Sequence, residues 1–237
     1  MINTPLLKLE AAKIGIDLDD TALAKFDKYA EMLVETNKTL NLTAITEPDE
    51  ILYKHFIDSL SLLHNVDIKK GAKVIDVGTG AGFPGLVLLI ARPDIEITLM
   101  DGTNKRLIFI QSVLDELNLN ANVIHMRAEL AGKEKTFREQ YDIATARAVA
   151  NMNVLSEYCL PFVKIGGIFA PMKASKGDNE LEDARNGVKL LGGEITEVKH
   201  LSIENCGERC IIITKKISHT PPKYPRASAQ ISKKPLI

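Results

Sequence analysis

One segment limits the possible folds more than any other, namely the glycine-rich stretch Val74–Gly85. Its first residues form a short β-branched run typical of a buried strand, and the apolar run after it predicts a helix over 86–91. Glycines between a strand and a helix let the backbone adopt positive φ angles and approach a ligand, while the helix start offers free N–H groups. The segment therefore predicts a ligand-binding loop in an α/β domain.

The rest of the chain alternates between strand-like and helix-like segments. Strands are predicted over 73–77, 95–100, 123–126, 142–145 and 165–171. Helices are predicted over 86–91, 105–118 and 154–162, and a terminal hairpin over 195–198 and 210–214. This alternation indicates βαβ units with right-handed crossovers. We therefore predict an α/β, Rossmann-like fold whose sheet is mostly parallel and ends in a C-terminal antiparallel hairpin.

The first 70 residues have a different, helical pattern. Asp17–Thr21 supplies helix-capping side chains, and apolar residues then recur every three or four positions. A second helix is predicted to start at Thr46–Asp49, where a proline lies in the first turn. We expect a helical N-terminal cap at 1–70, a Rossmann-like domain at 71–216 and a tail at 217–237, within one structural domain.

Charge is balanced overall and uneven locally. The 30 basic and 31 acidic residues give a net charge of −1, so global basicity does not indicate nucleic-acid binding. Residues 1–70 hold 12 acids and 8 lysines, whereas 215–237 hold six basic residues and no acid. Such a basic tail either binds phosphate or is simply solvated.

The same sequence argues against several protein classes. The longest apolar stretch is interrupted by Pro84, Arg92 and Pro93, and nothing reaches the ~18 residues of a membrane span. The amino terminus has no signal-peptide pattern, so we expect a cytoplasmic protein without membrane contact. The three cysteines do not form a disulfide framework, and no further Cys or His completes a zinc site beside Cys206 and Cys210. No metal is expected.

The glycine loop leaves two cofactor classes open. Gly80–Gly85 matches the dinucleotide fingerprint, and Asp101 lies about where a ribose-binding acid is expected. Asp76, however, favours a cationic ligand over a pyrophosphate, and Phe83 crowds a diphosphate but can wall an apolar pocket. S-adenosylmethionine carries an ammonium and a sulfonium group and no phosphate. We expect this donor to contact Gly78, Gly80, Phe83 and Asp101, with a nicotinamide dinucleotide as the alternative.

The ends of the next two strands complete the predicted pocket, because ligands bind at the carboxyl ends of strands in such sheets. Ala128 and Glu129 follow the third strand, where an apolar segment with an acid suits an adenine ring. Arg147 follows the fourth strand among small residues, which favours a site residue over a surface ion pair. His55 and Asp58 share a helix face, an arrangement that is structural more often than catalytic. Hydrolase, zinc-protease and nucleoside-triphosphatase motifs are absent.

A set of short motifs in a fixed order resembles the glucose-inhibited division protein B family. The motifs lie at 41–43, 55–60, 76–85, 101–106, 127–129 and 147–148. The resemblance extends from about Asn37 to the tail at Tyr224–Arg226. It implies a class I methyltransferase fold and an S-adenosylmethionine-dependent enzyme that methylates guanine N7 in 16S small-subunit ribosomal RNA. It also implies donor contacts for Gly78, Phe83, Ala128, Glu129 and Arg147.

The reaction that the resemblance implies asks little of a base, since guanine N7 already carries a free lone pair. We expect orientation and desolvation to dominate, with Arg147 positioning donor and nucleotide. Arg147, His55 and Asp58 remain the candidates for a catalytic residue. The expected partner is small-subunit ribosomal RNA, naked or assembled in a particle, and the protein is expected to be a monomer. A nicotinamide oxidoreductase and a non-catalytic RNA-binding or assembly factor remain the alternatives.

Overall fold

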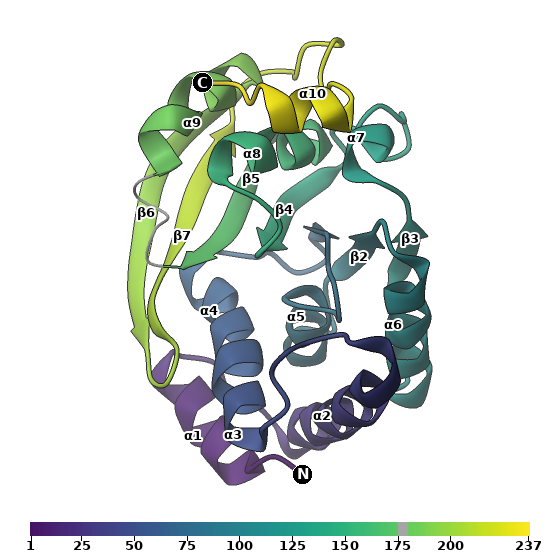
Figure 1. Cartoon of the computed structure of the whole chain (residues 1–237). Coiled ribbons are helices and arrows are strands. Elements are labelled where there is room, and N and C mark those ends of the chain that lie inside the picture. The colour runs from purple at the N-terminus through teal and green to yellow at the C-terminus, as the bar shows by residue number, and fades with distance from the viewer. Residues whose placement is uncertain (175–179) are drawn as a thin grey trace.

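A seven-stranded sheet forms the centre of the molecule (Figure 1). The computed structural model describes residues 1–174 and 180–237. The strands are β1 (Lys73–Val77), β2 (Glu96–Asp101), β3 (Asn122–His125), β4 (Tyr141–Arg147), β5 (Val163–Ala174), β6 (Gly193–Ile203) and β7 (Gly207–Lys216). Their order is β3-β2-β1-β4-β5-β7-β6, with the first five parallel and β7 antiparallel to both of its neighbours. The predicted α/β fold is confirmed, and the hairpin is longer at both ends than its apolar segments indicated.

Helices cover both faces of this sheet. They are α5 (Gly85–Ala91), α6 (Asn104–Glu116), α7 (Ala128–Ala131), α8 (Met152–Cys159) with a 3₁₀ turn (Leu160–Phe162), and α9 (Leu181–Leu190). Alternate residues of β1 point to opposite faces: Val74 packs in the core under α5 and α6, and Ile75 in the core under α8 and α9. The result is a three-layer arrangement. Helix α9 lies in a region where local sequence patterns predicted no element.

The N-terminal segment is helical, as predicted, and packs on the same face as α5 and α6. Its elements are α1 (Thr4–Lys13), α2 (Asp20–Leu40), α3 (Pro48–Glu50), the π-helix η1 (Ile51–Ile57) and α4 (Asp58–Asn65). Asp19 caps α2 by accepting a hydrogen bond from the Ala22 amide at 2.7 Å. The seven-residue π-helix was not predicted, and its wider turn becomes important at the site below.

The basic tail docks onto the domain more closely than either predicted alternative, phosphate binding or simple solvation, implies. Arg226 donates from its amide and its guanidinium to the fully buried carboxylate of Glu157 at 2.6–3.1 Å. Lys216 is fully buried and donates to the Leu160 carbonyl and the Thr220 hydroxyl, and burial lowers its pKa to about 8. A short helix, α10 (Ser228–Lys233), follows. Arg226 and Lys216 therefore serve internal packing and are not free to bind phosphate.

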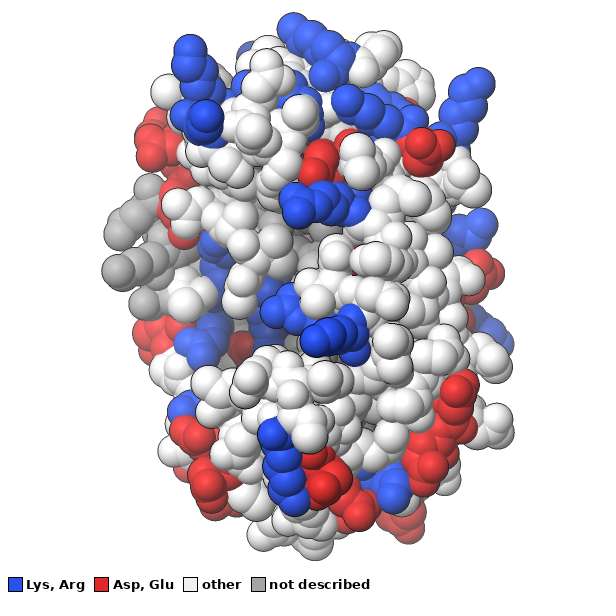
Figure 2. All heavy atoms as spheres, turned by 45° about the vertical axis from the view of Figure 1, so that its right-hand side comes forward, with Lys and Arg blue, Asp and Glu red and all other residues white. Residues whose placement is uncertain are grey.

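Basic and acidic side chains are distributed unevenly along the long axis of the molecule (Figure 2). Figure 2 shows Lys and Arg gathered toward the upper end and around a central hollow, whereas Asp and Glu concentrate toward the lower end. The lower end is formed by the acidic N-terminal helices and the upper end by the basic tail (Figure 1). Among the helices of the described residues, none is long and apolar enough to cross a membrane.

Candidate functional site

The glycine loop after β1 is held by hydrogen bonds to two carboxylates, those of Asp76 and Asp101. Gly78 and Gly80 have φ angles of +73° and +61°, which favour glycine. The fully buried Asp76 accepts hydrogen bonds at its Oδ2 from the Thr79 hydroxyl at 2.7 Å and the Gly85 amide at 2.8 Å. Asp76 therefore organises the loop from beneath and is not among the residues that line the two cavities described below, whereas its position at the strand end had predicted a place near the ligand.

Asp101, at the end of β2, fixes the outer side of the loop. Its Oδ2 accepts from the Gly80 amide at 3.0 Å and its Oδ1 from the Thr103 amide at 2.8 Å. Arg106 approaches the same carboxylate at 3.4 Å. Each carboxylate oxygen has two lone pairs, so Asp101 keeps acceptor capacity for the hydroxyls of a ligand. Gly80 thus acts through Asp101 and does not line the cavity described next.

A cavity of about 390 Å³ opens at the carboxyl ends of the parallel strands. Four of the predicted donor-binding residues line it, namely Gly78, Asp101, Ala128 and Glu129. The carboxylates of Asp101 and Glu129 are both largely buried. The buried part of the cavity is therefore acidic, with acceptors for hydroxyl and amino groups, while the more exposed Arg106 and Arg127 line its outer part. We refer to it as the donor cavity.

Phe83 and Arg147 lie beside the donor cavity and contact each other. The Phe83 ring is buried between the His55 ring, with centroids 4.2 Å apart, and the Tyr29 ring at 5.4 Å. The guanidinium carbon of Arg147 lies 5.0 Å from the centre of the Phe83 ring. Phe83 is among the lining residues of neither the donor cavity nor the larger cavity described below, so its predicted role as a pocket wall stays a prediction, and in this structure its ring supports the Arg147 guanidinium.

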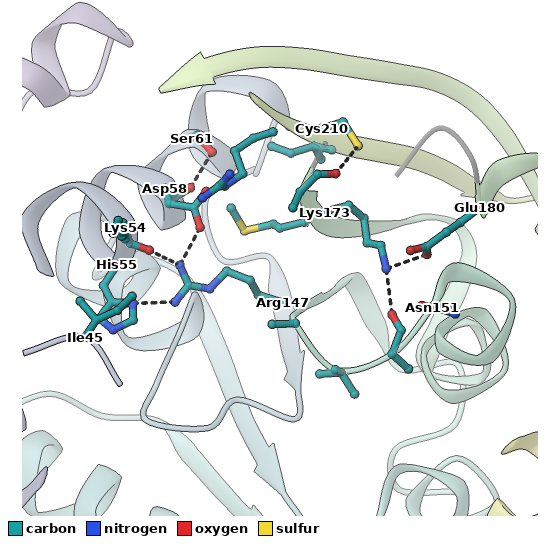
Figure 3. Close-up of a pocket in the computed structure, with 17 residues that line it drawn as sticks. Ile45, Lys54, His55, Asp58, Ser61, Arg147, Asn151, Lys173, Glu180 and Cys210 are labelled. Atoms are coloured by element: carbon teal, nitrogen blue, oxygen red, sulfur yellow. Dashed lines mark hydrogen bonds and ion pairs between the residues drawn. The ribbon is translucent and has the colours of Figure 1, made fainter. Parts of the chain in front are cut away.

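Arg147 is held by three further acceptors on the N-terminal helices (Figure 3). Its Nη1 donates to the Asp58 carboxylate at 2.7 Å and to the Lys54 carbonyl at 3.0 Å, and its Nη2 donates to His55 Nδ1 at 3.2 Å. The π-turn makes the Lys54 carbonyl available, since the Asp58 amide donates to the carbonyls of Tyr53 and His55 instead. The three candidate catalytic residues therefore form one hydrogen-bonded cluster.

The proton on His55 can be assigned from its partners. An arginine side chain only donates, so Nδ1 must accept from Arg147 and Nε2 must carry the hydrogen. Nε2 lies 3.0 Å from the Thr43 hydroxyl, which accepts this hydrogen. Burial, reinforced by the charge of Arg147, lowers the pKa of His55 to about 3. His55 is therefore neutral, and neither ring nitrogen is free to take a proton.

The Asp58 carboxylate forms ion pairs with two arginines. Its Oδ2 binds Arg147, and its Oδ1 accepts from Arg209 Nε at 3.1 Å. Arg209 comes from β7, so this carboxylate joins the N-terminal helices, the parallel strands and the hairpin. Sequence reasoning missed Arg209, because no local pattern marks it. It also gave no role to Thr43, although that residue lies in one of the motifs that carry the resemblance.

Figure 3 shows the residues that line a second cavity, of about 700 Å³. The two cavities share Ala148 and Val149 as lining residues, and Ala148 has a φ of +57° that a non-glycine residue rarely adopts. His55, Asp58 and Arg147 line this larger cavity and not the donor cavity. On its far side, Lys173 donates to the Ala150 carbonyl and pairs with Glu180, both at 2.8 Å. We refer to it as the acceptor cavity.

Comparison with known proteins places this geometry in a family. The chain is 44% identical over 233 residues to ribosomal RNA small subunit methyltransferase G of Alkaliphilus metalliredigens, covering 98% of each chain. It is 47% identical over 225 residues to the protein of the same name from an Exiguobacterium species, covering 94% of each. An S-adenosylmethionine-dependent O-methyltransferase structure from Thermotoga maritima shares the fold, with a TM-score of 0.52 and 17% identity over 79% of this chain and 72% of that one. The family profile described as "rRNA small subunit methyltransferase G" matches residues 22–211, and the chain belongs to this family.

Proposed function

We propose that this protein is an S-adenosylmethionine-dependent methyltransferase that methylates N7 of a guanine in 16S small-subunit ribosomal RNA, in the cytoplasm where ribosomes are made. The observation that carries the proposal is the donor cavity, which combines a glycine loop with two buried carboxylates and adjoins a larger cationic cavity. The shared name of the curated relatives supports the ribosomal RNA substrate.

The residues of the donor cavity fit this donor better than a dinucleotide. Asp101 and Glu129 can accept hydrogen bonds from ribose hydroxyls and from an amino group. Arg106 and Arg127 line the same cavity but are more exposed, so the buried carboxylates still disfavour a pyrophosphate. Asp76, fully buried beneath the loop, adds negative charge that favours a cationic ligand. These charges argue against a nicotinamide oxidoreductase, the alternative that the glycine spacing alone left open.

The cluster around Arg147 suits a reaction without a general base. When bound, S-adenosylmethionine supplies an electrophilic methyl group on its sulfonium. Both nitrogens of His55 are already engaged, and the Asp58 carboxylate is neutralised by arginines, so neither is placed to remove a proton. Arg147 instead acts as a fixed positive group between the cavities that orients the reactants.

Transfer of a labelled methyl group tests the proposal. Small subunits from cells that lack the gene should accept label from S-adenosylmethionine at one guanine N7, and deproteinised RNA serves as the second substrate form. Arg147→Lys keeps the charge and loses the planar fork, so turnover should fall about tenfold or more. Arg185→Lys, an exposed arginine on α9, is the matched control. Label in a different base would contradict the assignment of guanine N7 as the target. Wild-type turnover in Arg147→Lys would contradict the positioning role of Arg147.

A further inference from the structure

The acceptor cavity has the position and size of a nucleotide site. It adjoins the donor cavity along Ala148 and Val149, so a base held in it lies next to the methyl donor. Its volume of about 700 Å³ is in the range of ligand pockets, roughly 300–1,000 Å³. Apolar residues such as Met172 and Ile211 form part of its wall and can pack against a purine ring.

The charges that line the acceptor cavity do not cancel. Lys173 pairs with Glu180, and Lys54 pairs with Glu50 at the outer edge. The two arginines, by contrast, share the single carboxylate of Asp58, which leaves one positive charge without a counterion among the described residues. The side chain of Asp58 is only 7% exposed, so this surplus charge lies in a partly desolvated place that favours an anion.

Arg147 and Arg209 differ in how many of their guanidinium nitrogens already donate hydrogen bonds within the protein. Arg147 donates from both terminal nitrogens to groups of the N-terminal helices. Arg209 donates from Nε to Asp58 and from Nη1 to the Glu208 carbonyl at 3.0 Å, and among the described residues its Nη2 has no acceptor. Arg209 is also more exposed than Arg147, with 23% against 14% of its side chain accessible.

We propose that the acceptor cavity binds the target guanosine as a nucleotide turned out of its strand, and that Arg209 binds a phosphate of that nucleotide. This inference rests on the proposed function and names the substrate site within it. An arginine terminal N–H and a phosphate oxygen form a charge-assisted hydrogen bond, and the phosphate neutralises the surplus charge. Asp58 then orients both arginines, one for positioning the reactants and one for the RNA backbone.

The test measures RNA binding, which does not depend on methyl transfer. The association constant of the full-length protein for deproteinised 16S ribosomal RNA is determined between 50 and 300 mM salt, by fluorescence anisotropy. Arg209→Gln should bind about tenfold more weakly at low salt and should reduce the log–log salt slope by about 0.7, the value for one phosphate contact in a single strand. Its dissociation constant for S-adenosylmethionine, measured by calorimetry, should stay within about twofold of wild type.

Two further variants separate the phosphate contact from a structural effect. Arg209→Lys keeps a positive charge beside Asp58 and should restore the salt slope, whether or not Arg209→Gln is fully stable. Arg185→Gln removes an exposed arginine outside the cavity and should leave the slope unchanged. An unchanged slope in Arg209→Gln, an equal loss in Arg209→Lys, or weakened donor binding with normal RNA binding would overturn the inference. Absence of methyl transfer by the wild type would instead overturn the proposed function.

Discussion

Asp76→Asn should stabilise the protein at neutral pH relative to the wild type, by an amount that depends on pH. The wild-type carboxyl is fully buried, and burial raises its pKa from 3.8 to about 6. Its Oδ2 accepts two hydrogen bonds, whereas Oδ1 has no partner among the described residues. Ionisation in the folded state is therefore costly, and the protein carries that cost whenever the pH exceeds about 6.

The size and sign of the effect follow from the two pKa values. Because the folded-state pKa is the higher one, the contribution of Asp76 is most favourable below pH 3.8 and is lost as the pH rises through about 6. The full loss is about 3 kcal/mol, since one pKa unit corresponds to about 1.36 kcal/mol. Between pH 5 and 7.5 the loss is about 1.4 kcal/mol.

Urea unfolding at several pH values measures this difference. The asparagine side chain does not titrate, and its Oδ1 can still accept from Thr79 and Gly85. The free energy of unfolding of Asp76→Asn minus that of the wild type should therefore rise by about 1.4 kcal/mol from pH 5 to 7.5. Asp115→Asn, on the exposed side of α6, controls for the substitution itself. A difference that is flat or falls with pH would refute the argument.

Substitutions at three other positions test the site and the residues that support it. His55→Ala should lower turnover about tenfold, and His55→Gln should recover most of that loss. The turnover of the wild type and of both variants should stay constant between pH 6 and 8, because the pKa of His55 lies near 3. Gly78→Ala should raise the donor dissociation constant about tenfold without unfolding, since its φ is +73° and the new Cβ would lie 2.8 Å from Val149; unchanged affinity by calorimetry would contradict this. Glu157→Gln should lower the free energy of unfolding by about 3 kcal/mol, because it leaves Arg226 without its counterion, and a loss under 1 kcal/mol in urea would show that the pair contributes little.

Much of the fold follows from local sequence patterns. The β-branched runs and the apolar helices between them predict the order of the strands along the chain, and βαβ logic then predicts their parallel arrangement. The tail was harder to predict, because Arg226 and Lys216 look like surface residues until the fold brings Glu157 and Glu139 to them. Glu157, an acid in the apolar segment 152–159, is the signal that points to a buried partner.

The candidate site, like the fold, could be predicted from the sequence only in part. Residues at the ends of successive parallel strands could be predicted, because the sheet brings those ends together, and Gly78, Asp101, Ala128 and Glu129 do line one cavity. Contacts between distant elements could not be predicted. Arg209 reaches Asp58 across 151 positions of the chain, and no periodicity or motif encodes that encounter.

The π-helical turn at Ile51–Ile57 affects which insertions and deletions the enzyme can tolerate. Removing one residue from this segment would convert the wide turn into an ordinary α-helical one and improve the backbone hydrogen bonding of the helix. The same deletion would rotate everything before it by about 100° relative to α4, following the 3.6-residue period. The Lys54 carbonyl would then be used within the helix and turned away from Arg147. The segment length is thus fixed both by the contact of the Lys54 carbonyl with Arg147 of β4 and by the core packing of buried residues such as Ile51 and Leu52, and a shorter, more regular helix would lose both.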